Sequence, residues 1–264
     1  FAETAAKEAY EANDAKKVVC IVMDPENSDV LGMCNYPETD LNDLPRDDTS
    51  TLMALSRNTA AVDSYEPGST FKIITTASAL DSGTATLESE YNCNGYALVN
   101  GEKIKCWRSG RPHGHQNLTQ AVQNSCNPCF VSMALKMGKD TFYDYIKSFG
   151  FGKKTGIDYS SEAAGIVTDK KYVTDNDLAR IGFGQSVAVT PLQLINAVSA
   201  VINGGTLNTP SLVSRLEDAD GKTVEDFSDK KGEQVISEDT SQKMRAILQS
   251  VVDEGSGSNA RIDG

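Results

Sequence analysis

The chain has 264 residues and carries 25 lysine and arginine residues against 37 aspartate and glutamate residues, a formal net charge of −12. This acidity argues against a nucleic-acid partner, which would need basic surface, and against docking on anionic lipid. No run of about 18 apolar residues is present that could span a membrane. The chain starts without Met or a signal-peptide pattern, so we expect its ends to be cut rather than natural.

The N-terminal region is expected to form a surface helix followed by a β-hairpin. Residues 2–16 are rich in Ala, Glu and Lys, which is typical of an exposed helix. β-Branched runs at 18–23 and 30–34 flank a turn of Pro, Asn, Asp and Ser, and this pattern predicts two paired strands. Turn formers and acidic residues at 36–50 then predict a loop.

Cys20 and Cys34 would lie opposite each other if this hairpin is symmetric about Asn27. Two alternatives follow from that register. The pair is either two reduced, buried thiols or a cross-strand disulfide.

Helical patterns dominate the rest of the chain, so we expect an α+β fold. A polar stretch rich in Cys, His and Gly interrupts them at residues 90–118, and the charged residues at 216–235 predict a solvated hairpin or loop. The helix at 190–203 has the clearest start signals, because a Thr cap and a first-turn Pro precede an apolar body. The expected helices cover residues 69–81, 118–124, 130–137, 140–149, 190–203 and 238–253.

Ser69-Thr-Phe-Lys72 is the first chemical signal. On a helix, residues three apart share a face, so the Ser69 hydroxyl and the Lys72 amine could meet. Apolar neighbours would desolvate Lys72 and lower its pKa, which leaves neutral amine to take the serine proton. The alternative is a helix cap followed by an ordinary surface lysine.

Ser125-Cys-Asn127 favours the catalytic alternative, because it lies at a break between two helical stretches. A second hydroxyl there could relay a proton, and an Asn amide could hold a substrate amide. Ser-x-x-Lys followed by a Ser-x-Asn element is typical of β-lactamases and penicillin-binding proteins.

The sequence resembles the transpeptidase domain of class B penicillin-binding proteins over nearly its whole length. The similar segments are Ile21-Val-Met-Asp-Pro25, the run from Arg57 to Lys72, Asn124-Ser-Cys-Asn-Pro128, Gly182-Phe-Gly-Gln185 and Val189-Thr-Pro-Leu-Gln193. The cysteine pattern resembles clostridial elongation-type or sporulation-specific members. The resemblance implies a penicillin-binding/serine β-lactamase-like fold for residues 1–264, with an antiparallel sheet flanked by helices and an all-helical lobe.

The resemblance also implies a role for each matched residue. Ser69 would be acylated by the D-Ala-D-Ala end of a peptidoglycan stem peptide, or by a β-lactam that imitates it. Lys72 would be the base, Ser125 the proton relay, and Asn127 would bind substrate and hold Lys72. The protein would lie on the extracytoplasmic face of the membrane, anchored by an N-terminal segment absent from this chain, beside a membrane glycosyltransferase partner.

The third motif of the family, Lys-Thr/Ser-Gly on an active-site strand, has no clear counterpart. Lys154-Thr-Gly156 has the letters, but it resembles a family stretch outside the active site. In relatives, a segment like 251–264 runs directly into the strand with the motif. We therefore expect the domain to be incomplete at its C-terminus before that strand.

A cluster of metal-ligand residues occupies residues 93–129, which hold four of the six cysteines and both histidines. Thiolate and imidazole ligands favour tetrahedral zinc, while free thiols or disulfides are the alternatives. The resemblance to clostridial members favours a structural zinc held by Cys93, Cys106, His113 and Cys126. His115 and Cys129 are reserve ligands.

Three competing functions stay open at this point. A β-lactam sensor domain would be acylated without cross-linking peptidoglycan. A β-lactamase would need a base that activates water for deacylation, and no signature of one is found. A non-catalytic, zinc-stapled scaffold would fit the missing third motif.

Overall fold

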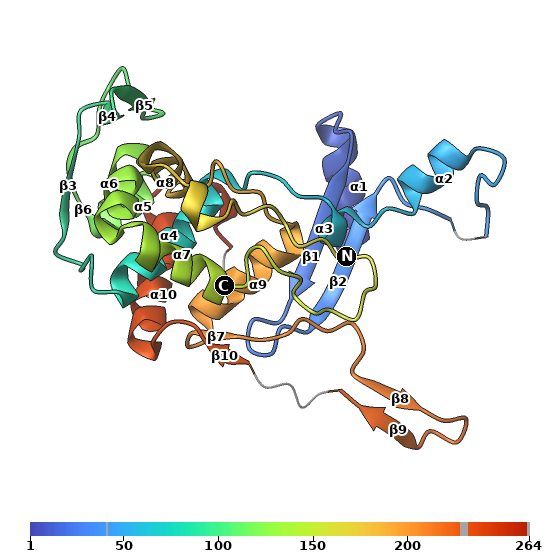
Figure 1. Cartoon of the computed structure of the whole chain (residues 1–264). Coiled ribbons are helices and arrows are strands. Elements are labelled where there is room, and N and C mark those ends of the chain that lie inside the picture. The colour runs from blue at the N-terminus through green and yellow to red at the C-terminus, as the bar shows by residue number, and fades with distance from the viewer. Residues whose placement is uncertain (41, 228–231, 263–264) are drawn as a thin grey trace.

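The computed structural model describes residues 1–40, 42–227 and 232–262. Two parts of the molecule can be distinguished in it. Helices gather into one lobe, and a β-hairpin with its covering helix forms the other part (Figure 1). The helix α9 (Pro191–Ile202) packs against elements of both parts. Within the described ranges, no helix is both long and apolar enough to cross a membrane.

The smaller part confirms the predicted N-terminal elements. Helix α1 (Ala2–Ala12) packs on the antiparallel strands β1 (Val18–Met23) and β2 (Val30–Tyr36). Cys20 and Cys34 are register partners, as the symmetric turn predicts, and both are free thiols. The loop after β2 gives way to two short helices that the sequence did not predict, α2 (Thr49–Leu55) and α3 (Thr59–Val62).

The helical lobe is built around α4 (Lys72–Asp81), in which seven of ten residues are buried. It packs against α6 (Asn127–Met137), α9 and α10 (Glu238–Asp253), and its small residues Ala77 and Ser78 are fully buried. The predicted helices are confirmed with small shifts in their ends, and α8 (Asp175–Ile181) was not predicted. The remaining helices are α5 (Leu118–Gln123) and α7 (Lys139–Ser148).

The polar stretch at 90–118 contains four short strands rather than an irregular segment. Strand β3 (Glu90–Cys93) pairs with β6 (Gly114–Asn117), and β4 (Tyr96–Val99) pairs with β5 (Glu102–Lys105). Strands of four residues carry too little alternation to be recognised in a sequence window. The expected α+β class is confirmed, with the described strands arranged as five separate antiparallel pairs.

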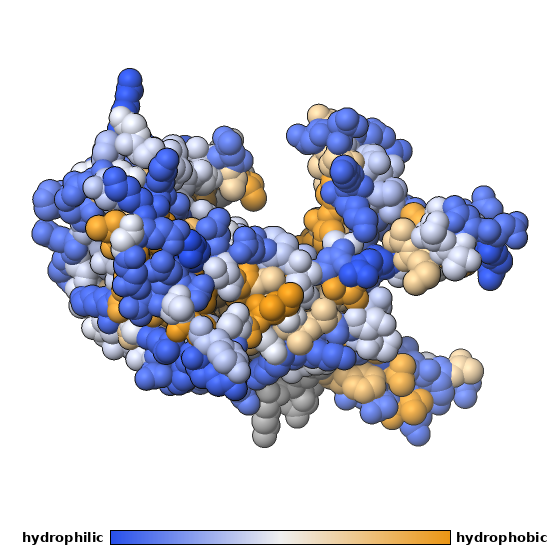
Figure 2. Space-filling view, turned by 45° about the horizontal axis from the view of Figure 1, so that its top comes forward, coloured by the Kyte–Doolittle hydropathy of each residue, from blue (hydrophilic) through white to orange (hydrophobic). Residues whose placement is uncertain are grey.

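A third hairpin projects from the body of the molecule (Figures 1 and 2). It is formed by β8 (Arg215–Glu217) and β9 (Thr223–Asp226), which confirms a hairpin in the charged segment at 216–235. Residues 228–231 of that segment lie outside the described residues. Figure 2 shows apolar side chains on the arm, where Leu216 and Val224 are exposed.

The remaining elements are short and lie between or after the main helices. Strands β7 (Thr206–Leu207) and β10 (Glu233–Gln234) form the fifth antiparallel pair. The 3-10 turns η2 and η3 span Lys170–Tyr172 and Ser258–Ala260.

Candidate active site

The Ser69–Lys72 segment forms a 3-10 turn that leads into a helix. The turn η1 (Gly68–Phe71) precedes α4, so the expected single helix from Ser69 is corrected: Ser69 lies before the α-helix begins. Gly68 has a positive φ of 58°, which breaks the helical path there. Residues three apart eclipse each other in a 3-10 helix, so Ser69 and Lys72 still face the same side.

Lys72 is the centre of the predicted catalytic group. Its Nζ lies 3.2 Å from Ser69 Oγ, 2.8 Å from Ser125 Oγ and 2.7 Å from Asn127 Oδ1. A further hydrogen bond of 2.8 Å reaches the Ser125 carbonyl oxygen. All four catalytic residues predicted from the sequence are therefore brought together around one amine.

Burial controls the charge of this amine. Lys72 is only 3% exposed, and its Nζ lies 5.1 Å from the ring centroid of Phe130. Desolvation lowers the pKa of Lys72 to about 8. About a tenth of the amine is therefore neutral at pH 7, and a general base acts in its neutral form. Ser69 itself is exposed and free to meet a substrate.

Ser125 and Asn127 occupy the joint between α5 and α6. Ser125 has a positive φ of 46°, an uncommon conformation for a residue with a side chain. Helix α6 starts already at Asn127, with Pro128 in its first turn, so the predicted break is shorter than expected. Asn127 Nδ2 donates to the Lys105 carbonyl oxygen at 3.3 Å, which orients its Oδ1 toward Lys72.

Contacts behind the turn hold the nucleophile in place, and sequence reasoning missed their role. The amide of Gly68 donates to the Gly184 carbonyl oxygen at 2.9 Å. A Cβ on Gly184 would lie 2.0 Å from the Gly68 carbonyl oxygen, so only glycine permits this approach. Glu66 Oε1 accepts the Ser186 amide at 2.7 Å. The repeated glycines of Gly182-Phe-Gly184 were the available signal.

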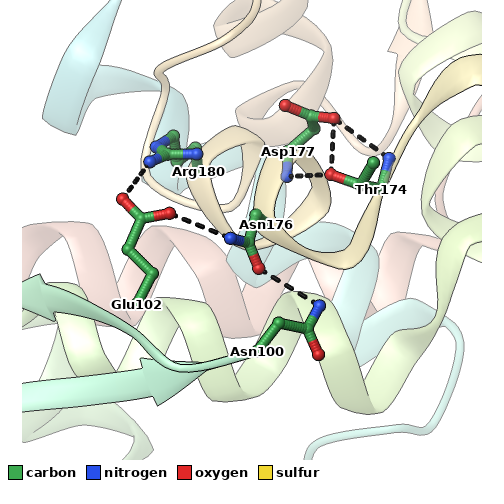
Figure 3. A network of polar contacts seen from close by, with 6 residues as sticks. All are labelled: Asn100, Glu102, Thr174, Asn176, Asp177 and Arg180. Carbon is green, nitrogen blue, oxygen red and sulfur yellow. Dashed lines mark hydrogen bonds and ion pairs between the residues drawn. The ribbon is translucent and has the colours of Figure 1, made fainter.

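A contact between the segment after β5 and the joint before Ser125 was also missed. Trp107 is the only tryptophan of the chain, and its indole N–H donates to the Asn124 carbonyl oxygen at 2.9 Å, directly before Ser125. At the start of β5, Glu102 pairs with Arg180 of α8 (Figure 3). Asn176 joins the same network, with its Nδ2 2.9 Å from Glu102 Oε2. The helical lobe therefore anchors the strands that precede this contact.

The four preferred metal ligands also come together, from strands and loops far apart in the sequence. Their ligand atoms lie within 4.8 Å of one another. Cys106 Sγ lies 3.5 Å from His113 Nδ1 and 3.9 Å from Cys126 Sγ. A tetrahedral zinc with its usual bond lengths would place S and N ligands about 3.5 Å apart and two S ligands about 3.8 Å apart. The group consists of Cys93, Cys106, His113 and Cys126.

The residue types of this cluster, three thiols and one imidazole, fit a metal site better than a hydrogen-bonded polar core. Burial raises the pKa of Cys106 to about 12, and burial also lowers the pKa of His113. Buried His113 Nε2 has no hydrogen-bond partner within the described parts of the chain. The reserve ligands stay outside the group, since His115 is exposed and Cys129 Sγ accepts from Gln116 Nε2 at 3.4 Å.

Lys154-Thr-Gly156 does not lie on a strand. The amides of Thr155 and Gly156 donate to Glu162 at 2.7 and 3.1 Å, and Lys154 is exposed. The loop geometry agrees with the sequence-based expectation that this tripeptide is not the catalytic third motif.

Comparison with known proteins identifies the class to which this fold and site belong. Residues 18–264 match the penicillin binding protein transpeptidase domain. The chain therefore belongs to this family, and the resemblance inferred from the motifs is confirmed.

Particular relatives and solved structures agree with this assignment. Stage V sporulation protein D of Bacillus subtilis is 43% identical over 94% of this chain and 38% of that protein, which agrees with a sporulation-type member. The D,D-transpeptidase domain of a peptidoglycan glycosyltransferase from Eggerthella lenta superposes with a TM-score of 0.87 at 27% identity, covering 98% of this chain and 66% of that one.

Penicillin-binding protein 3 of Mycobacterium tuberculosis, solved with aztreonam, shares the fold. It superposes with a TM-score of 0.89 at 23% identity, over 100% of this chain and 59% of that chain. The present chain spans less than half the length of the Bacillus subtilis relative.

Proposed function

We propose that this chain is the catalytic domain of a serine D,D-transpeptidase that cross-links peptidoglycan stem peptides. The observation that carries the proposal is the position of a buried, pKa-lowered Lys72 amine, 3.2 Å from Ser69 Oγ and 2.8 Å from Ser125 Oγ. The names of relatives support it, since the Eggerthella lenta structure is titled a D,D-transpeptidase domain.

The mechanism follows from these distances. Ser69 Oγ attacks the carbonyl carbon of the penultimate D-Ala while neutral Lys72 takes the hydroxyl proton. Ser125, hydrogen-bonded to the resulting Lys72 ammonium group, passes a proton to the departing amine of the terminal D-Ala. The penultimate D-Ala is then held as an ester on Ser69. An acceptor amine from a second stem peptide then attacks the ester, and its proton returns to Ser69 Oγ by way of Lys72.

β-Lactams would acylate the same serine. The aztreonam complex of the Mycobacterium tuberculosis protein supports this expectation by way of the shared fold. In the same proposal, the protein works at the extracytoplasmic face of the membrane beside a glycosyltransferase that supplies glycan strands.

Cys93, Cys106, His113 and Cys126 would hold a structural zinc beside this site. Four protein ligands leave no open position, so the metal would supply rigidity and no Lewis-acid chemistry. The support is the spacing of the ligand atoms, with Cys106 Sγ 3.5 Å from His113 Nδ1 and 3.9 Å from Cys126 Sγ. Because Cys126 lies between Ser125 and Asn127, a fixed Cys126 would restrain both side chains that contact Lys72.

Fluorescent penicillin labelling of wild type and Ser69→Ala tests the catalytic assignment. We expect stable labelling of wild type and none of Ser69→Ala, because Ser69 is the exposed hydroxyl beside Lys72, whereas Ser125, which also contacts Lys72, is partly buried and serves as the proton relay in this proposal. Ser148→Ala, at an exposed serine that ends α7, is the matched control and should label normally.

The same experiment separates the alternatives. Equal labelling of Ser69→Ala would refute the assignment, and absence of labelling in folded wild type would support a non-catalytic scaffold. Labelling without cross-linking of stem peptides would indicate a β-lactam sensor.

A further inference from the structure

The hairpin of β4 and β5, at the edge of the helical lobe, has one face that is open to solvent (Figure 1). Successive side chains of a strand point to opposite faces. On the inner face Ile104 is buried in the core of the lobe, and α6 packs against both strands. The opposite side of the hairpin, which we call the outer face, consists of the exposed residues Tyr96, Leu98, Lys103 and Lys105.

The outer face begins at the catalytic group. Asn127 Nδ2 donates to the Lys105 carbonyl oxygen at 3.3 Å, and Asn127 Oδ1 lies 2.7 Å from Lys72 Nζ. Lys72 Nζ in turn lies 3.2 Å from Ser69 Oγ. Ser69 Oγ and the Lys105 carbonyl oxygen are therefore no more than about 12 Å apart, a distance that about four extended residues span. A peptide whose C-terminal end lies at Ser69 is long enough to reach the outer face.

Trp107 and Arg108 continue this surface on the other side of Lys105. The Trp107 side chain is 63% exposed although its indole N–H is held by the Asn124 carbonyl oxygen. The Arg108 guanidinium lies 5.8 Å from the centroid of the Trp107 ring, and Lys103 Nζ lies 4.7 Å from that of Tyr96. Exposed aromatic rings and arginine are the residue types enriched at binding surfaces.

The charge of this region is opposite to that of the chain. Residues 91–138 hold five lysine or arginine residues and one acidic residue, Glu102, whereas the whole chain has a net charge of −12. Glu102 is already paired with Arg180. The lysine and arginine residues of the surface form no ion pair with any other described residue. These residues are Lys103, Lys105 and Arg108. The surface beside the catalytic group is therefore positive within an acidic protein.

We propose that the outer face, together with Trp107 and Arg108, binds the acidic part of the donor stem peptide. This inference rests on the proposed function, because it concerns the same substrate. Stem peptides carry free carboxylates ahead of their D-Ala-D-Ala end, and such a peptide is attracted to a cationic surface and repelled by the acidic remainder of the chain. The exposed rings of Tyr96 and Trp107 offer apolar contact to the carbon chain that bears the carboxylates.

Two synthetic peptides that end in D-Ala-D-Ala test the inference, one with free carboxylates and one with the same groups amidated. We expect kcat/KM for D-alanine release to be about tenfold higher for the acidic peptide at about 10 mM ionic strength and about twofold higher at about 0.5 M, because salt screens exposed charges. The difference should lie in KM, since the outer face does not contact the reacting atoms.

Lys103→Gln and Arg108→Gln should each lower the preference for the acidic peptide about threefold, because each removes one cation of the surface. Lys7→Gln is the matched control. It makes the same change of charge at an exposed lysine of α1, in the other part of the molecule, and should leave the preference unchanged. Penicillin labelling of Ser69 should persist in all three variants, because none of these side chains contacts Lys72 in the described structure.

The outcomes separate this inference from the proposed function. Equal kcat/KM for the two peptides, in a protein that penicillin labels at Ser69, would overturn the inference and leave the proposed function intact. An equal loss of preference in Lys7→Gln would also overturn it, because the peptides would then respond to net charge alone. A folded protein that neither labels nor releases D-alanine would refute the proposed function and this inference with it.

Discussion

Two clusters meet at the Ser125–Asn127 joint, and they differ in how completely the chain satisfies them. The Lys72 amine has four oxygen atoms within 3.2 Å. The Cys/His cluster holds Cys106, whose pKa burial raises, and a buried His113 Nε2 that has no hydrogen-bond partner among the described residues.

The difference indicates which parts of the site the chain builds alone. The Lys72 group is assembled by protein contacts, and an ion held at Cys126 would only add restraint to Ser125 and Asn127. The Cys/His group brings four ligand atoms within 4.8 Å of one another, and a metal bound by them would displace the thiol protons. Three predictions test this difference.

Lys72→Met should have the largest effect. It keeps a side chain of similar length but removes the base, and loss of a general base costs about 10²–10⁴-fold in rate. We expect the second-order rate constant for penicillin acylation to fall by about 10³, measured by stopped-flow or gel labelling. Metal content should stay unchanged, because Lys72 is not a ligand, and an unchanged acylation rate would remove Lys72 from the mechanism.

The pH profile should show the next largest effect. Only neutral Lys72 can accept the Ser69 proton, and desolvation places its pKa at about 8. The neutral fraction is then about 1% at pH 6 and about half at pH 8, so acylation should rise roughly 50-fold between them. A rate that is flat over this range, in a protein that stays folded by circular dichroism, would contradict the assigned base.

Metal removal should change the acylation rate least of the three tests, but it should clearly lower the stability of the fold. We expect one zinc per chain by elemental analysis. Chelation should lower Tm by more than about 5 °C and slow acylation about tenfold, because Ser125 and Asn127 lose their restraint. Cys106→Ser should reproduce both changes, while Cys20→Ser, in the distant hairpin, should reproduce neither. Full activity and stability after chelation would refute the structural role.

Much of the fold was predictable because its signals are local. The caps at Thr190 and Ser237 and the turn between β1 and β2 follow from short-range hydrogen bonding and backbone preference. The four strands between residues 90 and 117 were not predictable, because strands of four residues carry little periodic signal and depend on pairing partners up to 27 positions away.

The residues of the candidate site likewise fall into those that motifs identified and those that only the structure revealed. Ser69, Lys72, Ser125 and Asn127 were identified from motif letters and family resemblance, and the preferred metal ligands from resemblance as well. Gly184 and Trp107 were missed, because their roles arise from contacts with Gly68 and Asn124 that no spacing in the sequence reveals.

The type of chemistry could be inferred from the motifs alone, since only certain residue types at certain spacings make a serine nucleophile with a lysine base. Tertiary structure decided whether that lysine is a base at all, because its pKa depends on burial against Phe130 and on the packing of α4 within the lobe. Desolvation depends on the atoms that surround the amine. Those atoms come from segments that are distant in the sequence, so no single stretch of sequence determines the pKa of Lys72.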